Sequence, residues 1–461
     1  MFLLSAHEGR VDNVVMAKTF RPYEPDQLLL LPPSLQDWLP EKHLAYFVSD
    51  TIDGMDLSGF HARYESGGPR NQPFHPAMML KVLVYGYATG VFSSRKLARK
   101  LHEDVAFRIL GADNFPAHRT LSDFRALHLE DMNDVFVQVV RLAQECGLVK
   151  LGKVAIDGTK LKANANRNKA MSYGHMLRAE AELKEQIEGL LKKAQEVDAA
   201  EDQEPDVDIP KELHRREDRL KVIAAARKRL VARQREADLA QGRSEGDDRI
   251  PRNEDGTRAR GPGYKRDFGV PEDKAQEGFT DPESRLMKHP GGRFDYSYNA
   301  HTVVDAASHI IVVAELTNHV SDSGALPALV DAVIQNTGRK PGQVLADAGF
   351  KSEETFEQLE AAGVDAVVAL GREGKKDGAV EIVINEEKLP LTAVMSVKLK
   401  SLAGRAAYRM RKWIVEPPYG WIKNILGFRQ LSFRGAKKAQ GEWSLVCLAL
   451  NLRRMFTMQT A

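Results

Sequence analysis

The order of strand and helix patterns from residue 153 onward restricts the fold more than any other feature. Residues 153–157, Lys-Val-Ala-Ile-Asp, form a short apolar strand pattern that runs into a polar segment. Residues 294–305 and 309–317 are rich in β-branched and aromatic residues and lie on either side of a short turn, which predicts a β-hairpin. We therefore expect one strand, then a hairpin, at the start of a sheet.

Parallel strands follow the predicted hairpin. Residues 343–347 and 365–370 have strand patterns, and a helix is expected between them, from near Ser352, with acidic residues in its first turn. A strand, helix, strand order of this kind implies a parallel crossover. Together with the first strand, it predicts a mixed α/β fold: a ribonuclease H-like core, in which a mixed sheet is flanked by helices.

Helical patterns account for much of the remaining chain. Apolar residues three and four apart predict an all-α N-terminal domain, and two amphipathic helices separated by an acidic, proline-containing break predict an inserted helical hairpin. A Gly- and Pro-rich stretch from residue 242 to 292 is expected to be largely loop. The predicted divisions are a flexible tail (1–20), a helical DNA-binding domain (21–147), a ribonuclease H-like domain (148–170 and 290–461) and the inserted hairpin and loop (171–289).

Composition excludes several classes of protein. With 43% apolar residues in 461, the chain can bury sizeable cores. Cys146 and Cys447 lie in apolar helical patterns, so we expect two free, buried thiols, as in the reducing cytoplasm, and no disulfide framework. No apolar run reaches membrane-spanning length and no signal-peptide pattern opens the chain, so we expect no membrane partner.

Three carboxylates stand out by their positions. Asp157 ends the first predicted strand, Asp347 ends the fourth, and Glu416 is the one acid in a strongly basic C-terminal stretch. Divalent-metal phosphodiester chemistry needs such a set, because two ions about 3.5–4 Å apart clamp the attacking and leaving oxygens. Simpler explanations are a turn former for Asp157, a cap for Asp347, and an ion-pair partner of Arg411 or Lys412 for Glu416.

The segments around these acids resemble a known family. Asp157-Gly-Thr-Lys, Ala-Asp347-Ala-Gly-Phe and the spaced set Tyr408, Arg411, Glu416 and Lys423 resemble the three blocks of DDE transposases of bacterial insertion sequences, in the branch with a Tyr-Arg-Glu-Lys signature. Segments 75–81 and 120–125 resemble the helical domain that precedes the catalytic core in that group. The Arg-to-Glu interval is one residue longer than in the commonest form, so Arg411 and Lys412 both fit the arginine position.

The resemblance implies a DNA transposase that cleaves DNA and transfers strands at the ends of an insertion sequence. Asp157, Asp347 and Glu416 would be its catalytic residues and would bind two Mg²⁺ ions, with Mn²⁺ as a substitute. Its partners would be double-stranded DNA, as terminal inverted repeats and as target, and a second copy in a synaptic homodimer. It would act in the bacterial cytoplasm, at the nucleoid.

Two alternatives stay open. One is an element-derived DNA-binding protein that has lost catalysis, and the other is a ribonuclease H-like nuclease without strand transfer. The presence of all three acids argues against loss of catalysis. Pro417 and Pro418 count against one detail of the main hypothesis, because they disfavour an unbroken helix just after Glu416.

Basic side chains are the candidate DNA contacts. By resemblance, Lys423 would touch a phosphate near the scissile bond, and Tyr408 and Arg411 would position DNA. Phosphate contacts of this kind are salt-dependent and do not read sequence. The other candidates are Lys160, Lys162, Arg429 and Arg434, flanking the metal site on both sides, and, for reading the element's ends, Arg95, Lys96, Arg99 and Lys100, with Arg119 or Arg125.

Overall fold

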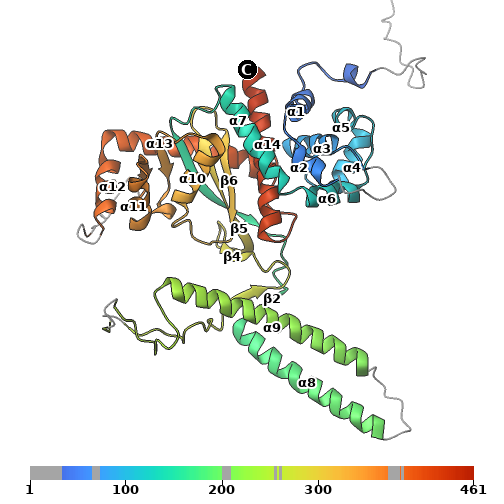
Figure 1. The fold of residues 1–461 in the computed structure, drawn as a ribbon, viewed down its shortest axis with the longest axis vertical. Helices are drawn as coiled ribbons and strands as arrows, with labels where there is room; N and C mark the ends of the chain where they lie inside the picture. Colours follow the sequence, from blue (N-terminus) through green and yellow to red (C-terminus); the bar gives the residue numbers. More distant parts are fainter. Residues whose placement is uncertain are drawn as a thin grey trace, which may run out of the picture.

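The computed structural model describes residues 34–64, 73–199, 209–253, 257–258, 262–371, 385 and 389–460. The predicted tail at 1–20 lies outside these residues. Figure 1 shows a body that contains the sheet and the N-terminal helices, and a long helical hairpin that extends away from it. In the described ranges, no helix is both long and apolar enough to cross a membrane.

The N-terminal part is all-α, as predicted. Helix α3 is buried along nearly its whole length, as expected for a helix that is apolar on all sides. Helix α4 is amphipathic: Leu97 and Leu101 are fully buried, whereas Arg95, Lys96 and Arg99 lie on its outer faces. The elements are η1 (Leu35–Trp38), α1 (Leu44–Asp53), α2 (Ser58–Ala62), α3 (Pro76–Ala88), α4 (Ser94–Glu103), α5 (Val105–Leu110), α6 (His118–Leu127) and α7 (Asp131–Glu145).

A mixed sheet forms the centre of the body, and its strand order is that of a ribonuclease H-like core. The main path runs β4-β5-β1-β7-β8, and β6 pairs with the same edge of β5 as β4. Strand β5 is antiparallel to β1, β4 and β6, and β1-β7 and β7-β8 are parallel. The strands are β1 (Val154–Lys162), β4 (Arg285–Lys288), β5 (Phe294–Asp305), β6 (Ile311–Thr317), β7 (Val344–Ala346) and β8 (Ala366–Val368).

The predicted hairpin and crossover are both present. Strands β5 and β6 form the hairpin, and α11 begins after Ser352, whose hydroxyl accepts a hydrogen bond from Thr355 N at 3.1 Å. Strand β4 lies in the stretch that the sequence predicted to be largely loop, and it extends the sheet along β5. The other elements of this part are α10 (Leu326–Thr337), η2 (Ala348–Phe350), α11 (Glu353–Ala361), α12 (Pro390–Lys400), α13 (Leu402–Gly420) and η3 (Trp421–Ile425).

Helix α14 (Ala436–Thr460) joins the N-terminal helices to the sheet. It packs against α3 and α7 on one side and β6 on the other, and one continuous apolar core includes residues of all of these elements. Gly441 allows a close approach, because a Cβ atom there would lie 2.2 Å from the Leu129 carbonyl oxygen. Cys447 of α14 is buried and free, as predicted, but Cys146 is free and exposed, because it follows the last turn of α7.

The inserted hairpin has a small core of its own. Helices α8 (Tyr173–Ala199) and α9 (Ile209–Ala240) pack together through Met176, Leu183 and Ile223, near the short strands β2 (Ala170–Ser172) and β3 (Gln276–Gly278). This separate cluster confirms the predicted helical hairpin.

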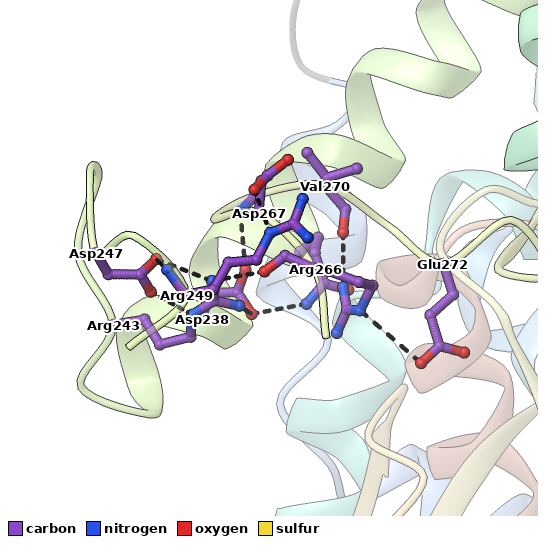
Figure 2. A network of polar contacts seen from close by, with 10 residues as sticks. Asp238, Arg243, Asp247, Arg249, Arg266, Asp267, Val270 and Glu272 are labelled. Carbon is purple, nitrogen blue, oxygen red and sulfur yellow. Dashed lines mark hydrogen bonds and ion pairs between the residues drawn. The ribbon is translucent and has the colours of Figure 1, made fainter. Parts of the chain in front are cut away.

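A network of ion pairs orders the loop that follows α9 (Figure 2). Arg243 is 5% exposed and binds Asp247 through Nε at 2.6 Å, with Asp238 3.5 Å from its Nη1. The ring of Tyr264 lies 4.1 Å from the same guanidinium. Asp238 also accepts a hydrogen bond from Gly269 N at 2.8 Å. The loop is therefore held against the end of α9 although it contains little regular structure.

Candidate active site

Asp157 and Asp347 belong to neighbouring parallel strands. The prediction that Asp157 ends its strand is wrong, because β1 continues to Lys162, whereas Asp347 directly follows β7 as predicted. Val154 and Ala155 of β1 are level with Val344 and Leu345 of β7, so the two aspartates follow closely matching positions along their strands. Asp347 Oδ1 accepts a hydrogen bond from Gly349 N at 2.9 Å, which also confirms its expected capping role. Burial raises the pKa of Asp157, the charge of Asp347 acts in the same direction, and Arg411 opposes both.

Arg411 is the cation that faces this pair. Its Nη1 lies 3.1 Å from Asp157 Oδ2, and the residue is 9% exposed. Burial opposes ionisation of this guanidinium, yet the charges of Asp157, Tyr408 and Asp347 raise its pKa on balance. The partly buried ring of Tyr408 lies 5.9 Å from the guanidinium carbon. The predicted Tyr-Arg pair is thus together at the first aspartate.

Helix α13 continues through both prolines, so the expected break after Glu416 is wrong. Pro418 has no N–H to donate to the carbonyl of Ile414, and His309 Nδ1 contacts that oxygen instead, at 3.2 Å. The following turn, η3, is a π-helix. Tertiary contact therefore compensates for the hydrogen bond that Pro418 removes.

The continuous helix brings two further residues to β1. Tyr419 donates a hydrogen bond to the backbone oxygen of Asp157 at 2.8 Å and accepts one from Thr302 at 2.9 Å. Lys423 Nζ binds the hydroxyl of Thr159, two residues after Asp157. Burial and Arg429 lower the pKa of this lysine, and Asp157 acts the other way.

Glu416 lies on α13 between Arg411 and Tyr419, and its side chain is exposed. In the described part of the chain, no three acidic, histidine or cysteine side chains converge as ligands for one metal ion. The structure thus brings Asp157, Asp347, Arg411 and Lys423 together, and Glu416 stays a predicted member of the set.

The basic residues expected on both sides of the site come from two segments that meet at the end of β1. The segment after Lys423 runs along the end of β1, where Lys162 N donates to Arg429 O at 3.3 Å and Leu431 N donates to Lys162 O at 2.8 Å. Arg434 Nε donates to Asn164 O at 3.0 Å, and Lys160 Nζ donates to Lys288 O at 3.2 Å. We call Lys160, Lys162, Lys423, Arg429 and Arg434 the basic ridge.

His289 lies near three cations of this ridge. Burial lowers the pKa of the neighbouring His289, and the charges of Lys162, Lys423 and Lys160 lower it further against Asp295. Lys160, Lys162 and Lys423 thus lie close enough to one imidazole to act on it, and Asp295, 3.2 Å from Lys162 Nζ, opposes them.

The N-terminal candidates divide into accessible and buried residues. Arg95, Lys96 and Arg99 lie on the outer faces of α4, and Lys100 pairs with Asp104 at 3.1 Å. Arg119 is exposed, but Arg125 is 4% exposed and donates to Tyr87 Oη at 2.7 Å and Phe92 O at 2.8 Å.

Arg125 is therefore a structural residue, and its predicted DNA contact is wrong. Its guanidinium also lies 4.7 Å from the Phe433 ring, so it ties the N-terminal helices to the segment before α14. Burial of this guanidinium against protein groups explains why its position on α6 does not make it a reader of DNA sequence.

One acid at the site was not predicted. Asp322, in the loop after β6, accepts hydrogen bonds from Asn299 at 2.6 Å and His301 at 2.8 Å. Burial raises the pKa of Asp322, but the hydrogen bonds from His301 and Asn299 lower it on balance. Its sequence signal is weak, since a polar residue in a loop is ordinary. The unusual feature is its two partners, Asn299 and His301, which are polar residues in a strand that is buried beyond Phe294.

Comparison with known proteins identifies the family. A family model described as a transposase DDE domain matches residues 255–452, which include Asp347 and Glu416 but not Asp157, and a transposase domain model, DUF772, matches residues 33–127. Neither the curated proteins nor the solved structures give a match. Two transposase matches, on the N-terminal helices and on the ribonuclease H-like part, identify the chain as an insertion-sequence DDE transposase.

Proposed function

We propose that this transposase cleaves and joins DNA strands with Asp157, Asp347 and Glu416 as its catalytic acids, and that these acids bind two Mg²⁺ or Mn²⁺ ions. The observation that carries the proposal is the placement of Asp157 and Asp347 at closely matching positions on two neighbouring parallel strands. Hard oxygen donors of this kind suit Mg²⁺. The raised pKa of Asp157 marks a buried negative charge that a cation would relieve.

When bound, the divalent ions would activate a water molecule or a DNA 3′-hydroxyl and would stabilise the leaving oxygen. The residues of the chain provide orientation. Tyr419 fixes the backbone of Asp157, and Lys423 is held by Thr159 where a phosphate close to the metal site would lie. Arg411, beside Asp157, would bind a second phosphate oxygen through its planar guanidinium.

The wider assignments form part of the same proposal. The ribonuclease H-like domain comprises 148–170 and 290–461, the helical domain at 21–147 reads the element's ends, and residues 171–289 are an insertion whose last strand, β4, joins the sheet. The branch with the Tyr-Arg-Glu-Lys signature is favoured by the contacts of Tyr408, Arg411 and Lys423 around Asp157. The active form on DNA is a homodimer at the nucleoid.

DNA cleavage with substrates that carry the element's ends tests the chemistry. We expect Mg²⁺-dependent cleavage and joined products from the unmodified protein, and DNA binding without cleavage from Asp157→Asn, Asp347→Asn and Glu416→Gln. Cleavage without joined products would favour the nuclease alternative. Binding without any cleavage in either Mg²⁺ or Mn²⁺ would favour the catalytically inactive alternative, and unaltered cleavage by Glu416→Gln would remove Glu416 from the set.

A further inference from the structure

A third carboxylate, Asp322, lies close both to β1, beside Asp157, and to the turn after β7 that begins with Asp347. A Cβ atom placed on Gly349 would sit 3.0 Å from Asp322 Oδ2 and 3.0 Å from Asp347 Oδ1. A Cβ atom on Gly158, the residue after Asp157, would sit 2.9 Å from Asp322 Oδ1. The two glycines thus leave room for Asp322 at both strands.

The two oxygens of Asp322 differ in their contacts. Asn299 and His301, which are 1% and 2% exposed in β5, both contact Oδ1. Over the described stretches of the chain, Oδ2 accepts no hydrogen bond. A carboxylate held through one oxygen in this way presents its second oxygen in a fixed direction, and here that oxygen shares the space at Gly349 with Asp347 Oδ1.

A buried donor that has no partner lies beside Asp157. Arg411 Nη1 is directed at Asp157, and Arg411 Nε is buried and has no hydrogen-bond acceptor among the residues that the structure describes. A buried donor without a partner is destabilising, and an entering phosphate oxygen would relieve that cost. Asp157 and Asp347 thus lie next to an unsatisfied donor for a phosphate. Asp322, held by Asn299 and His301 on the opposite face of β5, approaches the same carboxylates at Asp347.

We propose that Asp322 is a further residue of the catalytic pocket and holds a divalent cation beside Asp347 through one of the water molecules that Mg²⁺ retains. Contact through water fits the structure, because the described side chains include no group of three direct ligands. Asn299 and His301 are the positioning residues of this carboxylate. The inference rests on the proposed assignment of Asp157 and Asp347 as metal ligands.

Mn²⁺ binding to the full-length protein without DNA, measured by isothermal titration calorimetry, tests the inference. We expect Asp322→Asn to lower Mn²⁺ affinity about tenfold, at the low end of the range for residues that act on a metal through another group. Gly349→Ala should lower it similarly, because the new methyl group would occupy the space between the two carboxylates.

Matched controls separate this effect from the mere removal of a charge or of a glycine. Asp331→Asn removes an exposed acid from α10, and Gly152→Ala adds a Cβ atom that meets nothing within 4 Å. Both should bind Mn²⁺ as the unmodified protein does. His301→Ala should weaken binding, and His301→Gln, which keeps a side-chain donor for Asp322, should restore part of it.

Asp347→Asn distinguishes failure of the inference from failure of the proposed function. If Asp347→Asn abolishes Mn²⁺ binding while Asp322→Asn and Gly349→Ala bind normally, Asp322 is not part of the pocket and the inference is overturned. If Asp157→Asn and Asp347→Asn also bind Mn²⁺ normally, the proposed metal site fails and the inference fails with it. Should thermal melts show that Asp322→Asn is unfolded, Gly349→Ala and the two His301 variants decide.

Discussion

At the scale of single residues, Arg411 is the cation that pairs with the largely buried carboxylate of Asp157. Arg411→Met leaves Asp157 and Asp347 close together without a cation, and removal of one partner from a buried pair costs about 3–5 kcal/mol. Because Asp157 keeps 22% side-chain exposure, we expect the lower end of that range in chemical denaturation. Mg²⁺ should recover part of this stability.

A neighbouring arginine provides the control for this prediction. Arg409 lies on the same helix and is exposed, so Arg409→Met should change the free energy of unfolding by no more than about 0.5 kcal/mol. If the two substitutions destabilise the protein equally, Arg411 has no special role beside Asp157. If Mg²⁺ does not change the destabilisation of Arg411→Met, Arg411 does not occupy the place of a metal cation there.

The raised pKa of Asp157 predicts a pH dependence with a definite sign. The ordinary pKa of Asp157 is 3.8. At pH values between 3.8 and the raised pKa, the folded protein keeps the Asp157 proton that the unfolded chain releases. The contribution of this group to stability therefore falls as pH rises through this range. Asp157→Asn lacks this dependence. The free energy of unfolding of the unmodified protein, minus that of Asp157→Asn, should therefore decrease with rising pH, by about 1.4 kcal/mol for every pH unit that separates the folded from the unfolded pKa.

Denaturant titrations of the two proteins from pH 3.8 upward provide the measurement. The difference between the proteins isolates one carboxyl group, because every other acid is present in both. A difference that stays constant, or that grows with pH, would show that Asp157 is not destabilised in its charged form.

At the scale of elements, the contact between α14 and the segment before α7 depends on one glycine. A Cβ atom on Gly441 would lie 2.2 Å from the Leu129 carbonyl oxygen, which cannot move without shifting the start of α7. We expect Gly441→Ala to destabilise the protein by about 1–3 kcal/mol, the usual cost of overpacking. Gly189→Ala in α8 meets no atom within 4 Å and should stabilise slightly, by up to about 1 kcal/mol. Thermal melting of both variants compares the same chemical change in two helices.

The helices and strands also show how much of the fold can be predicted from the sequence. Strands β1, β5, β6, β7 and β8 have clear apolar patterns, and their order is sufficient to predict the sheet. Strand β4 has four residues in a Gly- and Pro-rich stretch, so its pairing with β5 has no local signal. The continuation of α13 past Pro418 depends on His309, more than a hundred residues away in sequence, which no local rule anticipates.

The same limit applies to the site. Asp157, Asp347, Arg411 and Lys423 lie in recognisable sequence blocks, and the fold brings them together. Asp322 comes from an ordinary polar loop, and only the packing of that loop over two glycines places it beside Asp347. The error about Arg125 has a different cause. In sequence, a buried arginine on a helix cannot be distinguished from an exposed one that could contact DNA, and only the structure shows that Arg125 is buried.

At the scale of the whole molecule, two basic surfaces lie on separate parts of the chain, the basic ridge beside Asp157 and the outer faces of α4. Phosphate contacts set affinity without regard to sequence, whereas base contacts set specificity. If the ridge holds the backbone and α4 reads the ends, removal of the two surfaces should have different effects on end DNA and unrelated DNA. This difference is measurable by fluorescence anisotropy at several salt concentrations.

We expect the triple variant Lys160→Ala, Lys423→Ala, Arg429→Ala to weaken binding to both DNAs equally, and to reduce the slope of log affinity against log salt by about 0.9 for each phosphate that is no longer neutralised. The triple variant Arg95→Ala, Lys96→Ala, Arg99→Ala should weaken binding to end DNA more than to unrelated DNA. The control is the triple variant Lys184→Ala, Lys192→Ala, Lys193→Ala, which removes the same charge from exposed positions of α8. It should change neither the ratio of the affinities for end DNA and unrelated DNA nor the slope of log affinity against log salt. Because each variant removes three positive charges, an equal effect of all three would mean that only net charge matters and that neither surface is a specific DNA site.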